Sequence, residues 1–172
     1  MIKGTGKNLV LPSGAHETTI DDMVARFVKG RPDEAHRTTL VKDLVDYLQL
    51  MTTLGFHITS VLVDGSFTTD KIGPSDIDCS PIIDGRRSNP TAEVRASATE
   101  NWVTPADSYK KKPVPFLNRT VKLAVYGVVR IPHDHPNYDL GRQNELQRRR
   151  FWQMERGHDL SKKGYLEVRV ND

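Results

Sequence analysis

The chain has 172 residues, a length that fits a single domain over residues 1–172 with its own hydrophobic core. Hydrophobic residues make up 37% and charged residues 27% of the chain, which argues against disorder throughout. The net charge of +3 is too small to indicate a partner, and the single cysteine excludes a disulfide scaffold and a cysteine-rich zinc site. Because no segment resembles a membrane span or a signal peptide, we expect a cytoplasmic protein that makes no membrane contact.

The N-terminal half of the chain contains two amphipathic helical patterns. Residues 1–15 are expected to be irregular, and a helix is predicted from Thr19, which has the spacing of a capping box with Asp22. Apolar residues at helical spacing continue this helix as far as Gly30. A second helix is predicted over residues 34–54. The apolar faces of both helices are expected to lie in the core.

Four segments have the β-branched or alternating composition of strands. They cover residues 57–63, 77–83, 120–131 and 165–170. The second of them contains Pro81, which predicts a bend or an edge position because proline has no N–H to donate to a neighbouring strand. The third is expected to be kinked at Gly127. Strands and helices together predict an α+β fold, with a mixed sheet and helices packed on one side of it.

Residues 84–119 carry four prolines and no clear periodicity, which predicts an irregular surface excursion with only a short helix near residues 92–102. A last helix is predicted over residues 141–156, with Phe151 and Trp152 in the core.

Two groups of basic residues stand out against the modest net charge. Lys110, Lys111 and Lys112 lie in the excursion, and Arg148 and Arg149 lie in the last predicted helix. Such clusters attract nucleic acid or nucleotide phosphates. The alternative is a solvated loop and a solvated helix face. We take these five residues as candidate nucleic-acid contacts.

The segment from Gly65 to Asp78 contains the candidate residues for binding a metal ion and a phosphate. Asp76 and Asp78 are two residues apart at the start of a predicted strand, so their side chains project from the same face. Two adjacent carboxylates repel each other unless a cation lies between them, and Mg²⁺ prefers a few carboxylate oxygens completed by water and phosphate. Upstream, the Gly65–Ser66 turn follows a strand, and glycine lets backbone N–H groups approach a phosphate. The alternatives are a turn cap for the aspartates and a turn hydroxyl for Ser66.

This segment, VLVDGSFTTDKIGPSDIDCSPII, resembles the nucleotidyltransferase superfamily, whose fold is that of DNA polymerase beta. A further likeness covers most of the chain through LPSGAHETTIDDMVARFV, YGVVRIPHDHP, GRQNELQRRRFW and KKGYLEVRV. These stretches resemble a small, stand-alone bacterial and phage-associated branch of the superfamily, known mainly as a domain of unknown function.

The resemblance implies a role for each matching residue. Gly65 and Ser66 would hold a nucleoside triphosphate (NTP), and Asp76 and Asp78 would bind Mg²⁺ or Mn²⁺. Lys71 is a candidate phosphate contact, its alternative being a solvated loop lysine.

The superfamily adds a third carboxylate on a later strand, but residues 120–131 contain no acid, and Val128 or Val129 stands in its place. Asp134 is the first candidate to replace it as the catalytic base, and Glu167 is the second. The alternative interpretations of the missing carboxylate are that the reaction uses no protein base or that the protein has lost catalysis.

The expected activity is therefore Mg²⁺-dependent transfer of a nucleoside monophosphate from an NTP to a hydroxyl of RNA, including tRNA, or of a protein. Small stand-alone members of the superfamily serve as toxins in toxin–antitoxin or phage-defence systems, which implies a cognate antitoxin as a partner. The alternative is a non-catalytic protein that binds nucleotides or nucleic acid on a degenerate transferase site.

Overall fold

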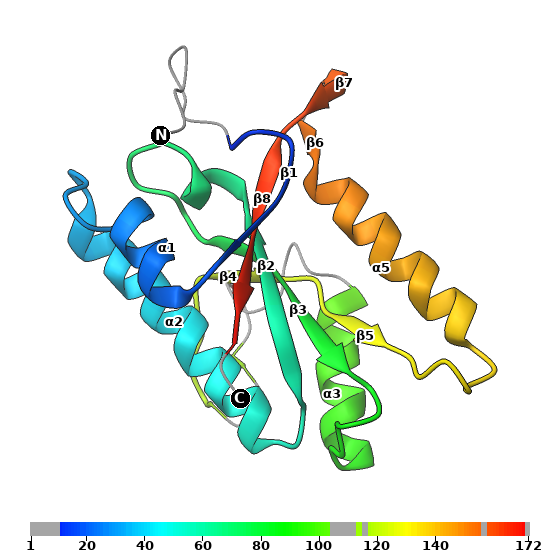
Figure 1. Ribbon diagram of the computed structural model, residues 1–172. Helices are drawn as coiled ribbons and strands as arrows, with labels where there is room; N and C mark the ends of the chain where they lie inside the picture. Colours follow the sequence, from blue (N-terminus) through cyan, green and yellow to red (C-terminus); the bar gives the residue numbers. More distant parts are fainter. Residues whose placement is uncertain (1–10, 104–112, 115–116, 156–157, 171–172) are drawn as a thin grey trace.

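The computed structural model describes residues 11–103, 113–114, 117–155 and 158–170. Its centre is a six-stranded mixed sheet in the order β1-β8-β2-β3-β4, with β5 also paired to β3 (Figure 1). The strands of this sheet are β1 (Gly14–Thr18), β2 (Ile58–Asp64), β3 (Ile77–Asp84), β4 (Leu123–Val125), β5 (Val128–Arg130) and β8 (Gly164–Arg169). The helices are α1 (Ile20–Phe27), α2 (Glu34–Thr53), α3 (Ala92–Val103) and α5 (Tyr138–Trp152), and a 3₁₀ turn, η1, spans Gly65–Thr68. The expected α+β fold with a mixed sheet is confirmed.

β3 is the strand on which the rest of the sheet is arranged. β2 pairs with it antiparallel, while β4 and β5 pair with it parallel on its other side. The kink expected at Gly127 is the break between β4 and β5. Pro81 is level with this break, because β4 pairs with residues 77–79 and β5 with residues 82–84. A proline is tolerated in this central strand because the partner strand is interrupted beside it.

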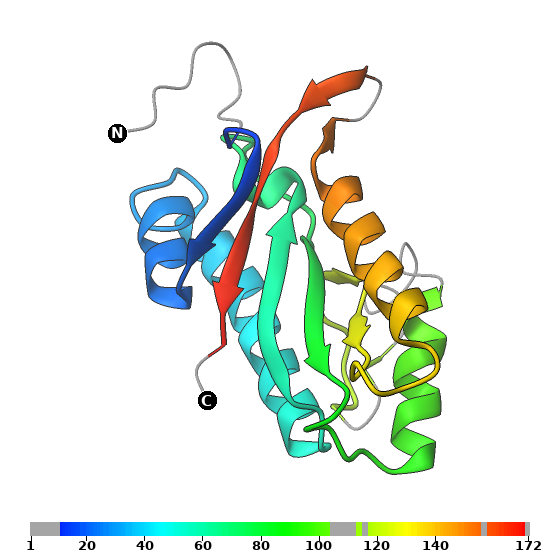
Figure 2. The ribbon, with the colours of Figure 1, turned by 45° about the vertical axis from the view of Figure 1, so that its right-hand side comes forward.

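The sheet has an apolar core on each face. Val61 and Val63 belong to the larger cluster, to which α1, α2 and α3 contribute. Leu62, which points to the opposite face, belongs to a smaller cluster with Trp152 of α5. Figures 1 and 2 show α1 and α2 on one side of the sheet and α5 on the other. The helices therefore cover both faces, which differs from the one-sided packing expected from the sequence.

Ion pairs hold α5 to its face of the sheet. Arg149 donates hydrogen bonds to both carboxylate oxygens of Glu167 on β8, at 2.7 and 2.9 Å. Glu145 lies between Arg149 and Arg130 of β5 and accepts from both guanidiniums. Ser60 of β2 donates to Glu167 at 3.0 Å. Because every acid in this network has a cationic partner, the charges can lie in a partly buried interface.

Three elements depart from the sequence-based expectation. A strand that the sequence did not predict, β1, begins at the end of the segment expected to be irregular and runs to Thr18, and its partner, β8, lies at the other end of the chain. A second small sheet joins β6 (Met154–Glu155) to β7 (His158–Lys162). The excursion contains α3, close to the helix expected there, while Lys110, Lys111 and Lys112 lie outside the described residues. Among the described residues, no helix combines the length and apolar character needed to cross a membrane.

The first prediction concerns the pH dependence of stability. Hydrogen bonds from Arg149 hold the pKa of Glu167 below its ordinary value of 4.5. An acid with a lowered folded-state pKa stabilises the fold above its unfolded-state pKa, and this contribution is lost as the pH falls through the folded value. Glu167→Gln should lower the free energy of unfolding by about 1–3 kcal/mol at pH 7, and the difference should shrink as the pH falls below 4.5.

Urea unfolding between pH 7 and pH 3 measures this difference. The matched control is Glu17→Gln, which removes an exposed ion pair with Arg169 and should change stability by less than about 0.5 kcal/mol throughout. A Glu167→Gln deficit that stays constant down to pH 3 would contradict the proposed electrostatic origin.

Candidate functional site

The site lies where β2 ends and β3 begins. Asp64, the last residue of β2, is paired with Asp78 in the antiparallel register, and the Gly65–Ser66 turn follows at once. Gly65 has a φ of +79°, in the left-handed region that favours glycine. A side chain there would also collide with Oδ2 of Asp78. The carboxylate of Asp78 thus lies directly against the backbone of the turn, and only glycine fits at this position.

Asp76 and Asp78 are neighbours in the fold as well as in the sequence. Asp76 is 6% exposed, and the hydroxyl of Ser75 donates to its Oδ1 at 2.8 Å. Burial raises the pKa of the Cys79 thiol far above its ordinary value, and the charges of Asp78 and Asp76 raise it further. Both carboxylates therefore act on the same buried sulfur, so their negative charges are concentrated at the start of β3.

This arrangement fits a cation that is shared with a substrate. Among the residues that the structure describes, no group of three or more His, Cys, Asp or Glu side chains is placed to hold a metal ion. Mg²⁺ commonly takes only one or two carboxylates and completes its octahedron with water and substrate phosphate. Asp76 and Asp78, beside the backbone of Gly65, provide such a partial set of ligands.

The structure adds Lys163 and Asp64, to which the sequence analysis assigned no role. Nζ of Lys163 lies 2.5 Å from Oδ2 of Asp64, whose side chain is only 2% exposed. Burial raises the pKa of Asp64, and the charge of Lys163 opposes this rise. The β2–β8 pairing runs as far as Val63 and Leu166, so Lys163, just before β8, lies at the same end of the sheet as Asp64. The Gly65–Ser66 turn thus has a carboxylate pair on one side and a positioned ammonium on the other.

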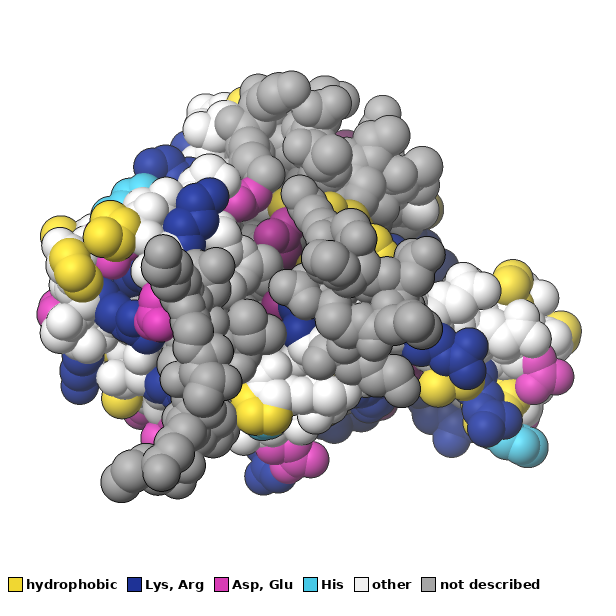
Figure 3. Space-filling view, turned by 90° about the horizontal axis from the view of Figure 1, so that it is seen from above, with side chains coloured by type: hydrophobic (Ala, Val, Ile, Leu, Met, Phe, Trp, Pro, Cys, Tyr) yellow, Lys and Arg dark blue, Asp and Glu magenta, His cyan; other side chains and the backbone are white. Residues whose placement is uncertain are grey.

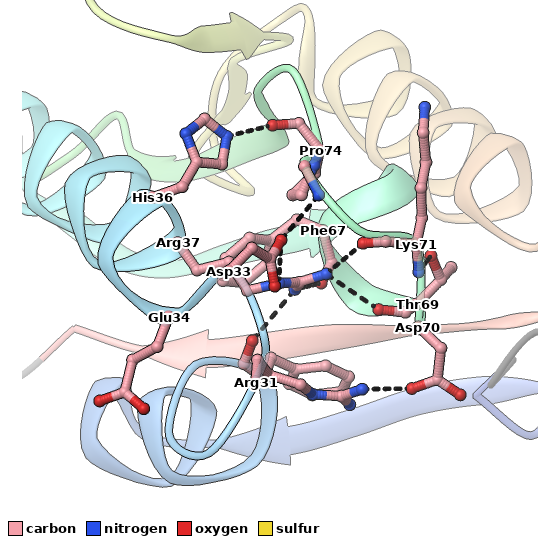
Figure 4. A network of polar contacts seen from close by, with 12 residues as sticks. Arg31, Asp33, Glu34, His36, Arg37, Phe67, Thr69, Asp70, Lys71 and Pro74 are labelled. Carbon is pink, nitrogen blue, oxygen red and sulfur yellow. Dashed lines mark hydrogen bonds and ion pairs between the residues drawn. The ribbon is translucent and has the colours of Figure 1, made fainter.

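Ser66 and Lys71 lie in the loop between the two strands. The Ser66 carbonyl accepts hydrogen bonds from the N–H and the hydroxyl of Thr69, which close the turn. The Lys71 carbonyl accepts from Arg37, while its side chain is exposed and extends away from this contact (Figure 4). The structure therefore places the Gly65–Ser66 turn against Asp78, with Asp76 two residues earlier, and it places Lys71 at the solvent side of the loop.

A buried guanidinium anchors this loop. Arg37 on α2 is 1% exposed, and its Nε lies 3.0 Å from both carboxylate oxygens of Asp33. Figure 4 shows its remaining nitrogens pointing to the loop. They donate to backbone carbonyls at 2.6–3.2 Å, those of Phe27, Phe67, Thr69 and Lys71. The Gly73 N–H donates to Asp33 at 2.7 Å, so the same ion pair holds both parts of the loop.

Removing this anchor is the second prediction. Arg37→Met would leave Asp33 without its cation and would strip four carbonyls, two of them buried and two partly buried, of their donor, so the free energy of unfolding should fall by about 3–5 kcal/mol. Arg37→Lys keeps the charge but loses the planar fork, so its loss should be smaller.

The matched control is Arg95→Met on the exposed face of α3, where the change should stay within about 0.5 kcal/mol. Urea unfolding at pH 7 measures all three variants. Equal stability of Arg37→Met and the wild type would show that the network is not a structural anchor.

The third prediction tests the contact between Gly65 and Asp78. Gly65→Ala should cost about 1–2 kcal/mol of backbone strain and a further 1–3 kcal/mol from the collision with the carboxylate. Gly73→Ala is the control, because Gly73 also has a positive φ, of +62°, but open space around the added carbon. Asp78→Ala should recover the collision part in the Gly65→Ala background, which a double-mutant cycle of unfolding free energies measures. Simple additivity of the two substitutions would contradict the contact.

Neither candidate for the third carboxylate lies at this site. β5 runs parallel to β3, and Arg130 pairs with Asp84, so the following Asp134 is at the far end of β3, roughly 20 Å along the strand from Asp78. Asp134 is exposed and pairs with Arg86 at 2.8 Å. The expected proximity of Asp134 to the aspartate pair is therefore wrong, and Ala124 of β4 is the residue level with Asp78.

The carboxylate of Glu167 is likewise bound by residues outside the site. Its carboxylate contacts Arg149 and Ser60, and Ser60 lies four residues before Asp64 on β2. The contact with Ser60 directs the carboxylate away from the end of the strand. Arg149, one of the candidate nucleic-acid contacts, is occupied by the same pair.

A family model matches residues 5–169 and is described as a family of unknown function, DUF6932. This match covers nearly the whole chain, and the chain belongs to this family. A search of the curated proteins and a search of the solved structures each found no match.

Proposed function

We propose that the protein is a Mg²⁺-dependent nucleotidyltransferase that moves a nucleoside monophosphate from an NTP to a hydroxyl of RNA or of a protein. The observation that supports this proposal most is the register of β2 and β3. It brings the Gly65–Ser66 turn against Asp78 and concentrates the charges of Asp76 and Asp78 at one strand end. A turn open to a phosphate beside a carboxylate pair is the equipment that phosphoryl chemistry requires.

Each residue of the site has a part in this proposal. The Gly65–Ser66 turn binds the triphosphate through the hydroxyl of Ser66, because the Gly65 N–H bonds to Asp64. Lys163, positioned by Asp64, neutralises the triphosphate from the β8 side. Asp76 and Asp78 hold the metal ion, which polarises the α-phosphate when bound. The acceptor oxygen bonds to the α-phosphorus, the bond from that phosphorus to the bridging oxygen breaks, and pyrophosphate leaves. The acceptor proton passes to water.

A second function has support from a separate observation. Asp134 and Glu167 are both paired away from the site, and Ala124 stands beside Asp78. This pattern favours a protein that binds nucleotides or nucleic acid without catalysing transfer, because general-base assistance is worth about 10²–10⁴-fold in rate.

The cellular setting is also a proposal. A cytoplasmic location would supply the NTP and Mg²⁺ that the site needs. A toxin role with a cognate antitoxin rests on the resemblance of the sequence to small stand-alone transferases.

The fourth prediction separates the two functions. The purified protein is incubated with Mg²⁺, each of the four labelled NTPs in turn, and total cell RNA or lysate. The transferase should label an RNA or a protein, and Asp76→Asn with Asp78→Asn should lower this transfer by at least about 100-fold. Mg²⁺-dependent NTP binding should be lost with it, while the fold is retained, because the substitutions remove like-charge repulsion.

Asp134→Asn is the matched control, since it makes the same chemical change at an exposed carboxylate distant from the site. Transfer by this variant should stay within about twofold of the wild type. Mg²⁺-dependent NTP binding without any transfer would favour the non-catalytic function, and the absence of both would overturn the proposed site.

A further inference from the structure

A groove of about 530 Å³ lies between β5 and α5, on the face of the sheet that also carries Asp64 and Asp78. Apolar side chains, those of Val128, Val129 and Ile131, line it from the β5 side, and side chains of three chemical kinds line it from one flank of α5. These are the amides of Asn144 and Gln147, the guanidinium of Arg148 and the ring of Phe151. Figure 3 shows Lys and Arg side chains beside hydrophobic ones on the part of the surface that α5 forms, at the right.

Arg148 is the unusual member of this groove. Its guanidinium carbon lies 4.8 Å from the centre of the Tyr126 ring and 5.4 Å from that of Phe151. Its Nε is buried and has no hydrogen-bond partner, and no carboxylate among the described residues pairs with it. Burial lowers its pKa. The next residue, Arg149, is fully engaged with Glu145 and Glu167. The groove therefore holds a partly desolvated positive charge that an anion can satisfy.

The ring of Phe151, beside Arg148, is open to a ligand. Phe151 was expected in the core from the sequence, but it is 49% exposed. It lies edge-on to Trp152, with ring centres 5.2 Å apart, and close to Tyr126, with ring centres 6.1 Å apart. Packing against these rings holds Phe151 in place, so that a flat ligand can stack on it without an ordering cost.

We propose that this groove binds one nucleotide of single-stranded RNA. Its base stacks on Phe151, its phosphate pairs with Arg148, and Asn144 and Gln147 contact the base edge or the 2′-hydroxyl. The amides suit RNA because, like the 2′-hydroxyl, they both donate and accept hydrogen bonds. An acidic peptide would satisfy Arg148, but it would not use a stacking ring and two amides together.

The groove is also correctly placed to present an acceptor, a role that rests on the proposed transferase function. Tyr126 donates its N–H to the carbonyl of Cys79 at 2.8 Å, and Trp152 donates to Ser80 at 2.9 Å. Cys79 and Ser80 directly follow Asp78, so the rings that pack behind Phe151 begin roughly 7 Å from Asp78 along β3. Val128, which lines the groove itself, pairs with Ile82, roughly 13 Å from Asp78 along the strand. An RNA strand with one nucleotide in the groove would therefore bring a hydroxyl of a nucleotide further along to the aspartate pair, which favours RNA over protein as the acceptor.

The test measures RNA binding without NTP or Mg²⁺, by the fluorescence anisotropy of a labelled single-stranded RNA of mixed sequence. Arg148→Gln should weaken binding by about tenfold and reduce the salt slope by about 0.7, the value for one phosphate contact. Phe151→Leu, which keeps an apolar side chain but loses stacking, should weaken binding by about 5–50-fold. The control is Arg142→Gln, which removes the same charge from an exposed position on another side of α5 and should stay within about twofold.

Thermal unfolding of each variant shows that it is folded. If Arg148→Gln and Arg142→Gln weaken RNA binding equally, the effect is a general electrostatic one, and the proposed binding site in the groove is contradicted. Effective competition by a poly-glutamate peptide would overturn it in favour of a protein partner, and equal binding of DNA of the same sequence would overturn the choice of RNA. If RNA binding depends on Arg148 but the protein has no transfer activity, the RNA-binding groove is supported and the transferase function is contradicted. If the protein transfers to RNA and Arg148→Gln leaves the KM for RNA unchanged, the transferase function is supported and the RNA-binding groove is contradicted.

Discussion

The buried guanidinium of Arg37 is the constraint on which the site depends. A loop that must present its backbone to a ligand cannot use its own carbonyls and N–H groups to form a regular element, so those groups need partners from elsewhere. Arg37 supplies donors to Phe27 on one side and to Phe67, Thr69 and Lys71 on the other. A lysine could not do this, because only guanidinium carries five donors in a fixed plane. The cost of burying the cation is offset by Asp33, and the result is a rigid loop after β2.

That rigidity matters because the strand end it supports concentrates acidic groups. Asp64 and Asp78 are directly opposite each other on adjacent strands, an arrangement that is unfavourable for like charges, and Asp76 adds a third carboxylate close by. Lys163 relieves the charge of Asp64, and the proposed function assigns a divalent cation to Asp76 and Asp78. In this proposal the sheet uses one acid, Asp64, to position a lysine and two, Asp76 and Asp78, to hold the ion.

Much of this arrangement could be predicted from local sequence, and the rest could not for physical reasons. Helices with a capped start, such as α1 after Thr19, and strands bounded by turns were predicted, because their signals lie within a few residues. The neighbouring positions of Gly65 and Asp78 followed from a strand–turn–strand pattern. Partners far apart in the chain were missed, such as β1 with β8 and Lys163 with Asp64, because register between distant segments leaves no local signal. The predicted position of Asp134 was wrong for the same reason. A residue that follows a strand in the sequence can lie at either end of the neighbouring strand, and the sequence does not show which.

Helix α5 has different chemistry on its two flanks. On one flank, Arg149 and Glu145 satisfy each other and the sheet, so this flank is closed and fixes the distance of the helix from β8. On the other flank, Arg148 has the same side chain one residue earlier, but neither a carboxylate among the described residues nor full exposure to water. Folding alone would favour either a partner or full solvation for such a cation. The closed flank therefore holds the helix still, and the open flank keeps a charge and a ring available beside β5. Because β5 pairs with β3, the groove and the start of β3 belong to one sheet, so a ligand in the groove is held in a fixed position relative to Asp78.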